Sequence, residues 1–310
     1  YTEEDKSIER LYEIIADAQY PAGIYIPAST KASETFDDTT PQLAVEYAYS
    51  DNINLYAKWS QGFKSGGFNG EAGSVAETVR PYSAEEVTSY EIGAKMMLLD
   101  NRLQLNTALF SNEHEDMQLS IFLAQGAAAS DVRNAGKATI EGFELEAVYA
   151  MSENVTGRLN YGYLQTEYDE FIEFGVEVAD NRAFPHAPRH TLTAGLDARL
   201  AEGDMGIFDL GVDVSHTSEY FTYPYALAPV GTENSAYNTQ AQSRTLVDAQ
   251  LRWSELPIAG QNVSLTLWGK NITDKEYIAN YIDFGAGFGG LTSGYFGEPR
   301  TYGLTVSMKW

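Results

Sequence analysis

The chain has 310 residues, a formal net charge of −24 and no cysteine, which excludes disulfide bonds, thiolate catalysis and cysteine-based metal sites. The large excess of acidic residues argues against nucleic acid as a partner, because binding to phosphates requires a basic surface. The most apolar stretch, Met96–Leu99, is far shorter than the roughly 18 apolar residues of a membrane-spanning helix, which excludes a helical membrane protein.

The first part of the chain does not share the pattern that dominates the rest. Four apolar side chains recur there at helical spacing: Ile8, Leu11, Tyr12 and Ile15. Ser7 precedes them and is a suitable helix N-cap. We therefore predict a short amphipathic helix over Ser7–Ala18, packed against a loop or a rim, within a long loop over residues 1–40. Residues 41–310 are predicted to form the strands of the main fold.

From Leu43 to the last residue, apolar and polar side chains alternate with period two. In chain order, the alternating segments are Leu43–Tyr49, Leu55–Trp59, Tyr90–Leu98, Leu103–Leu109, Phe143–Tyr149, Val155–Tyr163, Leu192–Leu200, Phe208–Val214, Val247–Trp253, Val263–Leu267 and Tyr302–Trp310. Alternation of this kind predicts strands with one apolar face and one polar face. The pattern indicates about eleven such strands.

The connections between these segments alternate between short and long. The short ones are Ser50–Asn52, Asp100–Asn101, Ser152–Asn154, Glu202–Asp204 and Glu255–Gly260, and the long ones cover 64–85, 117–136, 169–188, 221–243 and 277–296. A soluble β-sandwich also has strands with one apolar face, but its loops lack this regular alternation. Tight periplasmic turns and long extracellular loops are typical of a barrel that spans a membrane. Segments such as Arg189–Leu200 are long enough to cross a bilayer when tilted.

The sequence therefore predicts an all-β fold, an antiparallel transmembrane β-barrel, with residues 1–40 in an extracellular loop. Charges of both signs occupy only the polar face, which we expect to face the lumen: Glu46, Lys58, Glu91, Lys95, Glu144, Arg158, Asp197, Arg199, Asp248 and Arg252. Aromatic residues stand at the ends of the apolar stripes, as in a membrane-interface girdle: Trp59, Tyr149, Trp253 and Trp310.

Five stretches resemble the C-terminal part of a TonB-dependent outer-membrane receptor. They are Leu55–Asn69 (LYAKWSQGFKSGGFN), Arg80–Gly93 (RPYSAEEVTSYEIG), Val132–Glu146 (VRNAGKATIEGFELE), Gly269–Tyr277 (GKNITDKEY) and Gly297–Trp310 (GEPRTYGLTVSMKW). The resemblance implies a barrel of 22 strands closed by an N-terminal plug domain. This chain is then similar to the second half of the barrel, without the plug domain and the first half.

The resemblance also implies a function and partners. It implies TonB-dependent active uptake of a scarce small-molecule ligand across the outer membrane of a Gram-negative bacterium, with a ferric siderophore expected first and cobalamin or an oligosaccharide as alternatives. The implied partners are the TonB complex through the N-terminal part, outer-membrane lipid and lipopolysaccharide, and the barrel-assembly machinery through the C-terminal strand that ends in Trp310. A passive porin-like channel and an outer-membrane or soluble β-sandwich enzyme are the competing interpretations.

Candidate ligand contacts lie in the long connections, where aromatic residues are dense. The candidates are Phe68, Asn69, Arg80, Tyr82, Tyr220, Tyr223, Tyr225, Tyr281 and Phe288. Aromatic rings can stack on a siderophore, and arginine pairs with an anionic iron chelate. For each residue taken alone, packing between loops is the competing interpretation.

Other motifs do not lead to a catalytic or cofactor function. Glu113–Asp116 holds a single histidine without a metal-ligand spacing, so we interpret it as a solvated acidic rim. Gly285–Gly290 matches G-x-G-x-x-G, but a loop that returns to another strand lacks the strand–turn–helix context of dinucleotide binding. We therefore expect no enzyme activity, no cofactor and no metal site.

Overall fold

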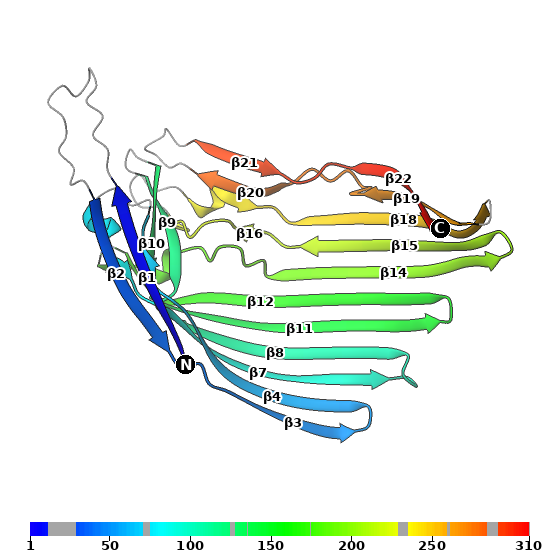
Figure 1. Ribbon diagram of the computed structural model, residues 1–310, viewed down its shortest axis with the longest axis horizontal. Helices are drawn as coiled ribbons and strands as arrows, with labels where there is room; N and C mark the ends of the chain where they lie inside the picture. Colours follow the sequence, from blue (N-terminus) through cyan, green and yellow to red (C-terminus); the bar gives the residue numbers. More distant parts are fainter. Residues whose placement is uncertain are drawn as a thin grey trace, which may run out of the picture.

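The centre of the fold is one curved antiparallel sheet, seen in a computed structural model that describes residues 1–11, 29–70, 75–124, 128–134, 136–173, 175–228, 235–258, 261–283 and 291–309 (Figure 1). Eleven strands follow one another across it in chain order: β3 (Gln42–Ser50), β4 (Ile53–Lys64), β7 (Glu85–Leu98), β8 (Leu103–Glu115), β11 (Gly136–Ser152), β12 (Val155–Glu173), β14 (His190–Gly203), β15 (Gly206–Thr217), β18 (Arg244–Ile258), β19 (Gln261–Lys270) and β22 (Thr301–Lys309). The all-β antiparallel prediction of about eleven strands is confirmed.

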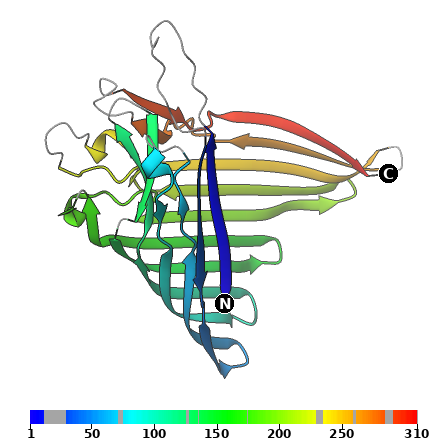
Figure 2. The same ribbon diagram turned by 60° about the vertical axis from the view of Figure 1, so that its left-hand side comes forward.

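The remaining elements gather at one end of the sheet (Figures 1 and 2). Five hairpins pair there: β1 (Thr2–Leu11) with β2 (Ser29–Asp38), β5 (Gly67–Phe68) with β6 (Pro81–Tyr82), β9 (Gln118–Ala124) with β10 (Ala128–Asn134), β16 (Tyr220–Phe221) with β17 (Gln240–Ala241), and β20 (Ile278–Asp283) with β21 (Thr292–Phe296). The other elements are β13 (Val176–Glu177), which pairs with β12, the helix α1 (Val75–Thr78), and the 3₁₀ turns η1 (Ala179–Asn181) and η2 (Ala236–Thr239). No helix in the described ranges is long and apolar enough to cross a membrane.

The two ends of the sheet differ as predicted. At one end the strands are joined by tight turns, such as Asp51–Asn52 between β3 and β4 and Asp204–Met205 between β14 and β15. The turn between β7 and β8 places Leu99, Asp100 and Asn101 at positive φ, a conformation that asparagine and aspartate tolerate well. The opposite end carries the long connections and all the short hairpins.

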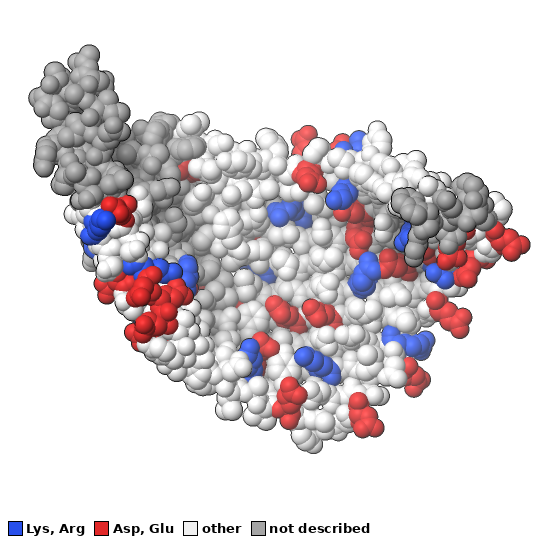
Figure 3. All heavy atoms as spheres, in the orientation of Figure 1, with Lys and Arg blue, Asp and Glu red and all other residues white. Residues whose placement is uncertain are grey.

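The strand register places all ten predicted polar-face residues on one side of the sheet, here called the charged face. Residues directly opposite each other in an antiparallel pair project to the same side, as Lys58 and Glu91 do. Arg158 forms ion pairs with Asp197 and, at 3.0 Å, with Asp213, so one guanidinium joins three strands. Acidic and basic side chains lie interspersed over the face that Figure 3 shows. The opposite side is here called the apolar face.

On the charged face, aromatic rings lie over glycines of the next strand. A β-carbon at Gly93 would lie 2.5 Å from the Tyr56 ring and 2.5 Å from the carbonyl oxygen of Thr107. Tyr56 is held in place by a 2.7 Å hydrogen bond that its hydroxyl donates to Glu91, and Lys95 lies 5.7 Å from the ring centroid. Only glycine leaves room for this arrangement.

Three of the four predicted girdle aromatics lie in the described ranges, on the apolar face. Trp59 lies opposite Leu43 and Tyr149 opposite Leu103. Trp253 stacks on Phe208 with 5.0 Å between ring centroids, and its indole N–H donates to the Met205 carbonyl at 2.7 Å. Trp310 lies outside the described residues. The membrane-interface role of these residues stays a prediction.

The predicted helix over Ser7–Ala18 is wrong for its first turn. Residues up to Leu11 belong to β1, which pairs with β2 from Thr2↔Asp38 to Leu11↔Ser29. The hairpin satisfies the backbone groups along this length and adds cross-strand contacts, including Glu9–Lys31 at 3.0 Å. This pairing, which local periodicity cannot reveal, overrides the helical spacing. Residues 12–18 lie outside the described ranges.

Candidate ligand-binding site

Two of the hollows among the long connections are lined by predicted ligand residues. The first has a volume of about 660 Å³ and lies between β1, the end of β4 and the β5–β6 hairpin. It is lined by two of the predicted ligand residues, Phe68 and Tyr82, together with Lys6 and Lys64. Lys6 is paired with Glu4 at 2.6 Å, and Glu4 also accepts a 2.9 Å hydrogen bond from the Ser65 hydroxyl.

A buried glutamine forms the floor of this first hollow. The side-chain amide of Gln118 donates to the carbonyl oxygens of Lys64, Ser65 and Ser83 at 3.0–3.3 Å. Its backbone N–H donates to Glu85, which is also 3.0 Å from the His114 ring. Burial by itself raises the pKa of Glu85, but the hydrogen bonds from His114 and Gln118 outweigh burial and lower it. Gln118 therefore ties the connection 117–136 to both ends of the connection 64–85.

The predicted ligand residue Asn69 has a similar structural role. It is 8% exposed, and its amide exchanges two hydrogen bonds with the backbone of Val132, at 2.8 and 3.1 Å. These bonds join the connection after β4 to β10. Packing between loops, the competing interpretation for this residue, is what its contacts support.

The second hollow has a volume of about 490 Å³ and lies between the end of β12 and the connections that precede β14 and β18. Its lining includes Tyr168, Arg182, Phe184, Arg189 and Tyr220. Aromatic faces and guanidinium groups therefore meet in one cavity, a combination suited to an anionic ligand with flat groups.

Tyr168 is the most unusual residue of this second hollow. Its side chain is 5% exposed and packs edge-on against Phe171 and face-on against Phe184, with ring centroids 5.1 and 4.7 Å apart. Within the described residues, its hydroxyl has no hydrogen-bond partner. Burial raises the pKa of Tyr168, so the group is a neutral donor at physiological pH. Tyr168 therefore belongs to a buried apolar cluster with Leu119, Ala138 and Phe171, and its ring forms part of the wall of the hollow.

A β-bulge lies directly after Tyr168. Tyr168 lies opposite Ala138 and Glu170 opposite Lys137, so Asp169 is the extra residue on β12. Its carboxylate accepts a 2.7 Å hydrogen bond from the Thr139 hydroxyl. Tyr168 still follows the regular alternation of β12, whereas the bulge changes the side of the sheet to which Glu170 projects.

Arg182 contributes charge to the same hollow from a buried position. Its side chain is 7% exposed and is paired with Glu173, whose side chain is 19% exposed. The pair neutralises much of the guanidinium charge, whereas Arg189 at the rim lies 5.8 Å from the Tyr163 ring centroid. The hollow therefore combines one compensated and one more accessible guanidinium.

The predicted tyrosines after β15 mostly join connections to each other. The hydroxyl of Tyr220 donates to the Ala279 carbonyl at 2.7 Å, and that of Tyr225 to the Asp283 carbonyl at 3.0 Å. Tyr223 packs against Tyr225 with ring centroids 5.5 Å apart, and burial raises the pKa of Tyr225. Of these three, Tyr220 lines the second hollow.

The other predicted ligand residues are dispersed. Arg80 is exposed between α1 and β6, and Tyr281 lies in β20 with its backbone N–H bonded to the Asn280 side chain at 2.9 Å. Phe288 lies outside the described residues.

Four residues that line the second hollow were not predicted from the sequence: Tyr168, Arg182, Phe184 and Arg189. The available signal was one aromatic residue, Tyr168, between two acidic residues at the point where the alternation of β12 ends.

The acidic stretch Glu113–Asp116 forms rim contacts. His114 faces Glu85, and Glu115 pairs with Lys137 at 2.9 Å. Within the described ranges, no group of three or more histidine or acidic side chains is arranged to hold a metal ion.

The buried side chain of Asn271 holds the stretch Gly269–Tyr277 in its conformation. Asn271 is 4% exposed at positive φ; its amide donates to the carbonyls of Lys275 and Glu298 and accepts from the Lys275 N–H. We expect Asn271→Ala to destabilise the connection after β19 by about 2 kcal/mol, because two backbone carbonyls and one backbone N–H lose their side-chain partner. Limited proteolysis should cut residues 271–300 faster, with Asn271→Asp intermediate, since it keeps the acceptor; unchanged protection in both variants would contradict this role.

The comparisons with known proteins agree with this geometry. A model of the family described as TonB dependent receptor-like, beta-barrel matches residues 17–272. The chain is 26% identical to a ferric-pyoverdine receptor of a Pseudomonas strain, over 93% of this chain and 31% of that protein. It is 23% identical to the ferrichrome outer membrane transporter/phage receptor of Escherichia coli, over 76% of this chain and 28% of that protein.

Solved structures share the fold. The ferric yersiniabactin uptake receptor FyuA from Yersinia pestis superposes with a TM-score of 0.70 at 19% identity, covering 93% of this chain and 40% of that one. The chain spans about a third of the length of the two curated relatives.

Proposed function

The chain belongs to the TonB-dependent receptor-like β-barrel family, and we propose that it forms part of an outer-membrane receptor for the active uptake of a ferric siderophore. The relatives named above bind ferric pyoverdine, ferrichrome and ferric yersiniabactin according to their names, which favours this ligand class over cobalamin or an oligosaccharide. The location is the outer membrane of a Gram-negative bacterium.

The observation that carries the proposal is the meeting of aromatic rings and guanidinium groups in the second hollow. A ferric siderophore has oxygen atoms that accept hydrogen bonds, flat chelating groups that stack on aromatic rings, and usually negative charge. Phe184 supplies an aromatic face and Arg189 a positive charge. Both residues lie near the long connections, at the end of the sheet that is extracellular in this family.

The partners follow from the same proposal. The charged face, with its mixed acidic and basic side chains, lines the lumen and contacts a polar plug domain contributed by another part of the receptor. TonB acts on that part and not on the strands described here. The edges of β3 and β22 have no neighbouring strand in the described sheet, and both expose apolar side chains, such as Tyr47 at 62% and Tyr302 at 79%. We propose that further barrel strands cover both edges, because unpaired edges are not tolerated in hydrocarbon.

Uptake of iron-55 tests the proposed function. The full-length receptor, produced in a strain without other ferric receptors, should import at least one of ferrichrome, ferric pyoverdine and ferric yersiniabactin, and an uncoupler should abolish import. Import that continues after the proton gradient collapses would support a passive channel instead.

Arg189→Gln tests the site itself. We expect ligand affinity to fall about tenfold, because one charge-assisted hydrogen bond to an anionic ligand is lost. Folding should be unaffected, because Arg189 is exposed. Arg102→Gln, at an exposed arginine of the turn between β7 and β8, is the matched control and should bind like the unmodified receptor. Unchanged affinity in Arg189→Gln would remove this guanidinium from the site.

A further inference from the structure

Arg244 contacts the connection after β15 and the connection after β19, next to the second hollow but outside its lining. It is the first residue of β18, directly opposite Thr217 of β15, and the alternation from Asp248 places its side chain on the charged face. Its guanidinium lies over two tyrosine rings, 5.6 Å from the ring centroid of Tyr220 and 5.1 Å from that of Tyr277. A guanidinium is flat and positively charged, so it is attracted to aromatic faces.

Both tyrosines are held by further contacts. The Tyr220 hydroxyl donates to the Ala279 carbonyl at 2.7 Å, so Tyr220 contacts the chain two residues beyond Tyr277. The Tyr277 ring leaves no room for a β-carbon at Gly297, whose backbone N–H donates to the Tyr277 carbonyl at 2.9 Å. Arg244 therefore joins a ring that is fixed to the last connection, Tyr277, to a ring that lines the second hollow, Tyr220.

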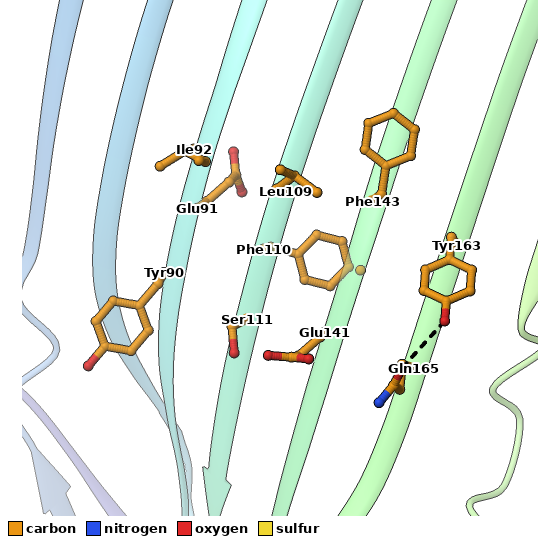
Figure 4. A pocket seen from close by; sticks show the side chains of 11 residues that line it. Tyr90, Glu91, Ile92, Leu109, Phe110, Ser111, Glu141, Phe143, Tyr163 and Gln165 are labelled. Carbon is orange, nitrogen blue, oxygen red and sulfur yellow. Dashed lines mark hydrogen bonds between the residues drawn. The ribbon is translucent and has the colours of Figure 1, made fainter.

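Another guanidinium near this hollow has a different environment. Arg189 lies over the ring of Tyr163, which belongs to the long strand β12. Figure 4 shows that the hydroxyl of Tyr163 points to Gln165 of the same strand, to which it donates at 3.4 Å. Arg189 therefore contacts a ring of the strand wall, whereas Arg244 contacts the rings of two connections that are far apart in the sequence.

We propose that Arg244 is a positioning residue of the ligand site, which fixes the Tyr220 ring in the wall of the second hollow by holding it against Tyr277. The inference rests on the ligand site proposed above. Tyr220 lines that hollow and Arg244 does not, so Arg244 acts without touching the ligand. A ring that is already in place loses less conformational freedom when the ligand binds, which raises affinity.

Binding of iron-55 chelates to the purified full-length receptor tests the proposal, with ferrichrome, ferric pyoverdine and ferric yersiniabactin as the probes. Arg244→Met keeps a side chain of similar shape without the charge, and it should lower the affinity for any probe that binds by about fivefold. Arg244→Lys should restore part of the affinity, because an ammonium keeps a cation–π contact. Arg252→Met, on the same strand and the same face, is the matched control and should bind like the unmodified receptor. Unchanged affinity in Arg244→Met, with Arg189→Gln still weakened, would overturn the role of Arg244 and leave the ligand site in place.

A double-mutant cycle separates positioning from a general loss of stability. Tyr220→Leu should weaken binding by itself, and the addition of Arg244→Met should cause no further loss, because the ring that Arg244 holds is then absent. Losses that multiply in the double variant would show that Arg244 acts independently of Tyr220, and would overturn the proposal. Heat-modifiable migration on gels verifies that each variant is folded.

Hydrogen exchange without ligand measures the link between the two rings directly. In Arg244→Met, the peptides that contain Tyr220 and Tyr277 should exchange about threefold faster, whereas the peptide of β4, on the other side of the sheet, should not change. Unchanged exchange in both tyrosine peptides would overturn the proposal even if none of the three probes binds. Faster exchange in a receptor that binds none of the probes would support the contact and contradict the proposed function instead.

Discussion

Leu196→Arg is expected to destabilise the receptor in lipid vesicles by about 2–4 kcal/mol. Leu196 lies near the middle of β14 on the apolar face, opposite Gly157 on one side and Val212 on the other. An arginine there must place its guanidinium in hydrocarbon or bend toward the interface. The cost is largest near the bilayer midplane and falls toward either interface.

The measurement is a urea titration of the receptor folded into vesicles, followed by tryptophan fluorescence. Thr193→Arg is the control, because Thr193 lies on the same strand and projects to the charged face, opposite Asn160 and Ser215. Its guanidinium would point to the lumen, where arginines already occur, so the midpoint should move by less than about 1 kcal/mol. Equal destabilisation by both variants would contradict the assignment of the two faces.

The faces of the long strands could be predicted from sequence because a period of two leaves no ambiguity over ten residues. Each of the predicted charged residues, from Glu46 to Arg252, falls on one side of the sheet once the register is known. The tight turns could also be predicted, because Asp100 and Asn101 are residue types that tolerate positive φ. These signals lie within single strands and turns, and strand pairing keeps the faces that the alternation defines.

The candidate site was much harder to predict from the sequence, because its contacts join residues that are far apart in the chain. Gln118 joins Lys64 and Ser83, and Tyr168 packs on Phe184 across a connection. No spacing rule relates such residues. Aromatic density drew attention to the long connections, but it did not separate a tyrosine that holds two loops together, such as Tyr225, from one that is part of a buried apolar cluster, such as Tyr168. The pairing of Thr2–Leu11 with β2 was missed for the same reason, since the two strands are far apart in the sequence.

Gly93→Val is expected to destabilise the barrel by about 3 kcal/mol, the second large effect. The added β-carbon would meet the Tyr56 ring and the Thr107 carbonyl, each 2.5 Å away. A hydrogen bond from the Tyr56 hydroxyl to Glu91 restrains the ring. The Thr107 carbonyl cannot move by itself, because it belongs to the backbone of β8. Either the ring leaves its site, with loss of that hydrogen bond, or the strands β7 and β8 shift.

Gly203→Ala is the control for the general effect of replacing a strand glycine. Nothing lies within 4 Å of a β-carbon at Gly203, which is at the end of β14, so this variant should be neutral or slightly stabilising. Tyr56→Ala in the Gly93→Val background separates the two clashes: stability should recover in part, because the ring contact disappears while the Thr107 contact remains. A Gly93→Val receptor with an unchanged urea midpoint would show that the wall yields at this point, and that the close approach of ring and strand does not determine its stability.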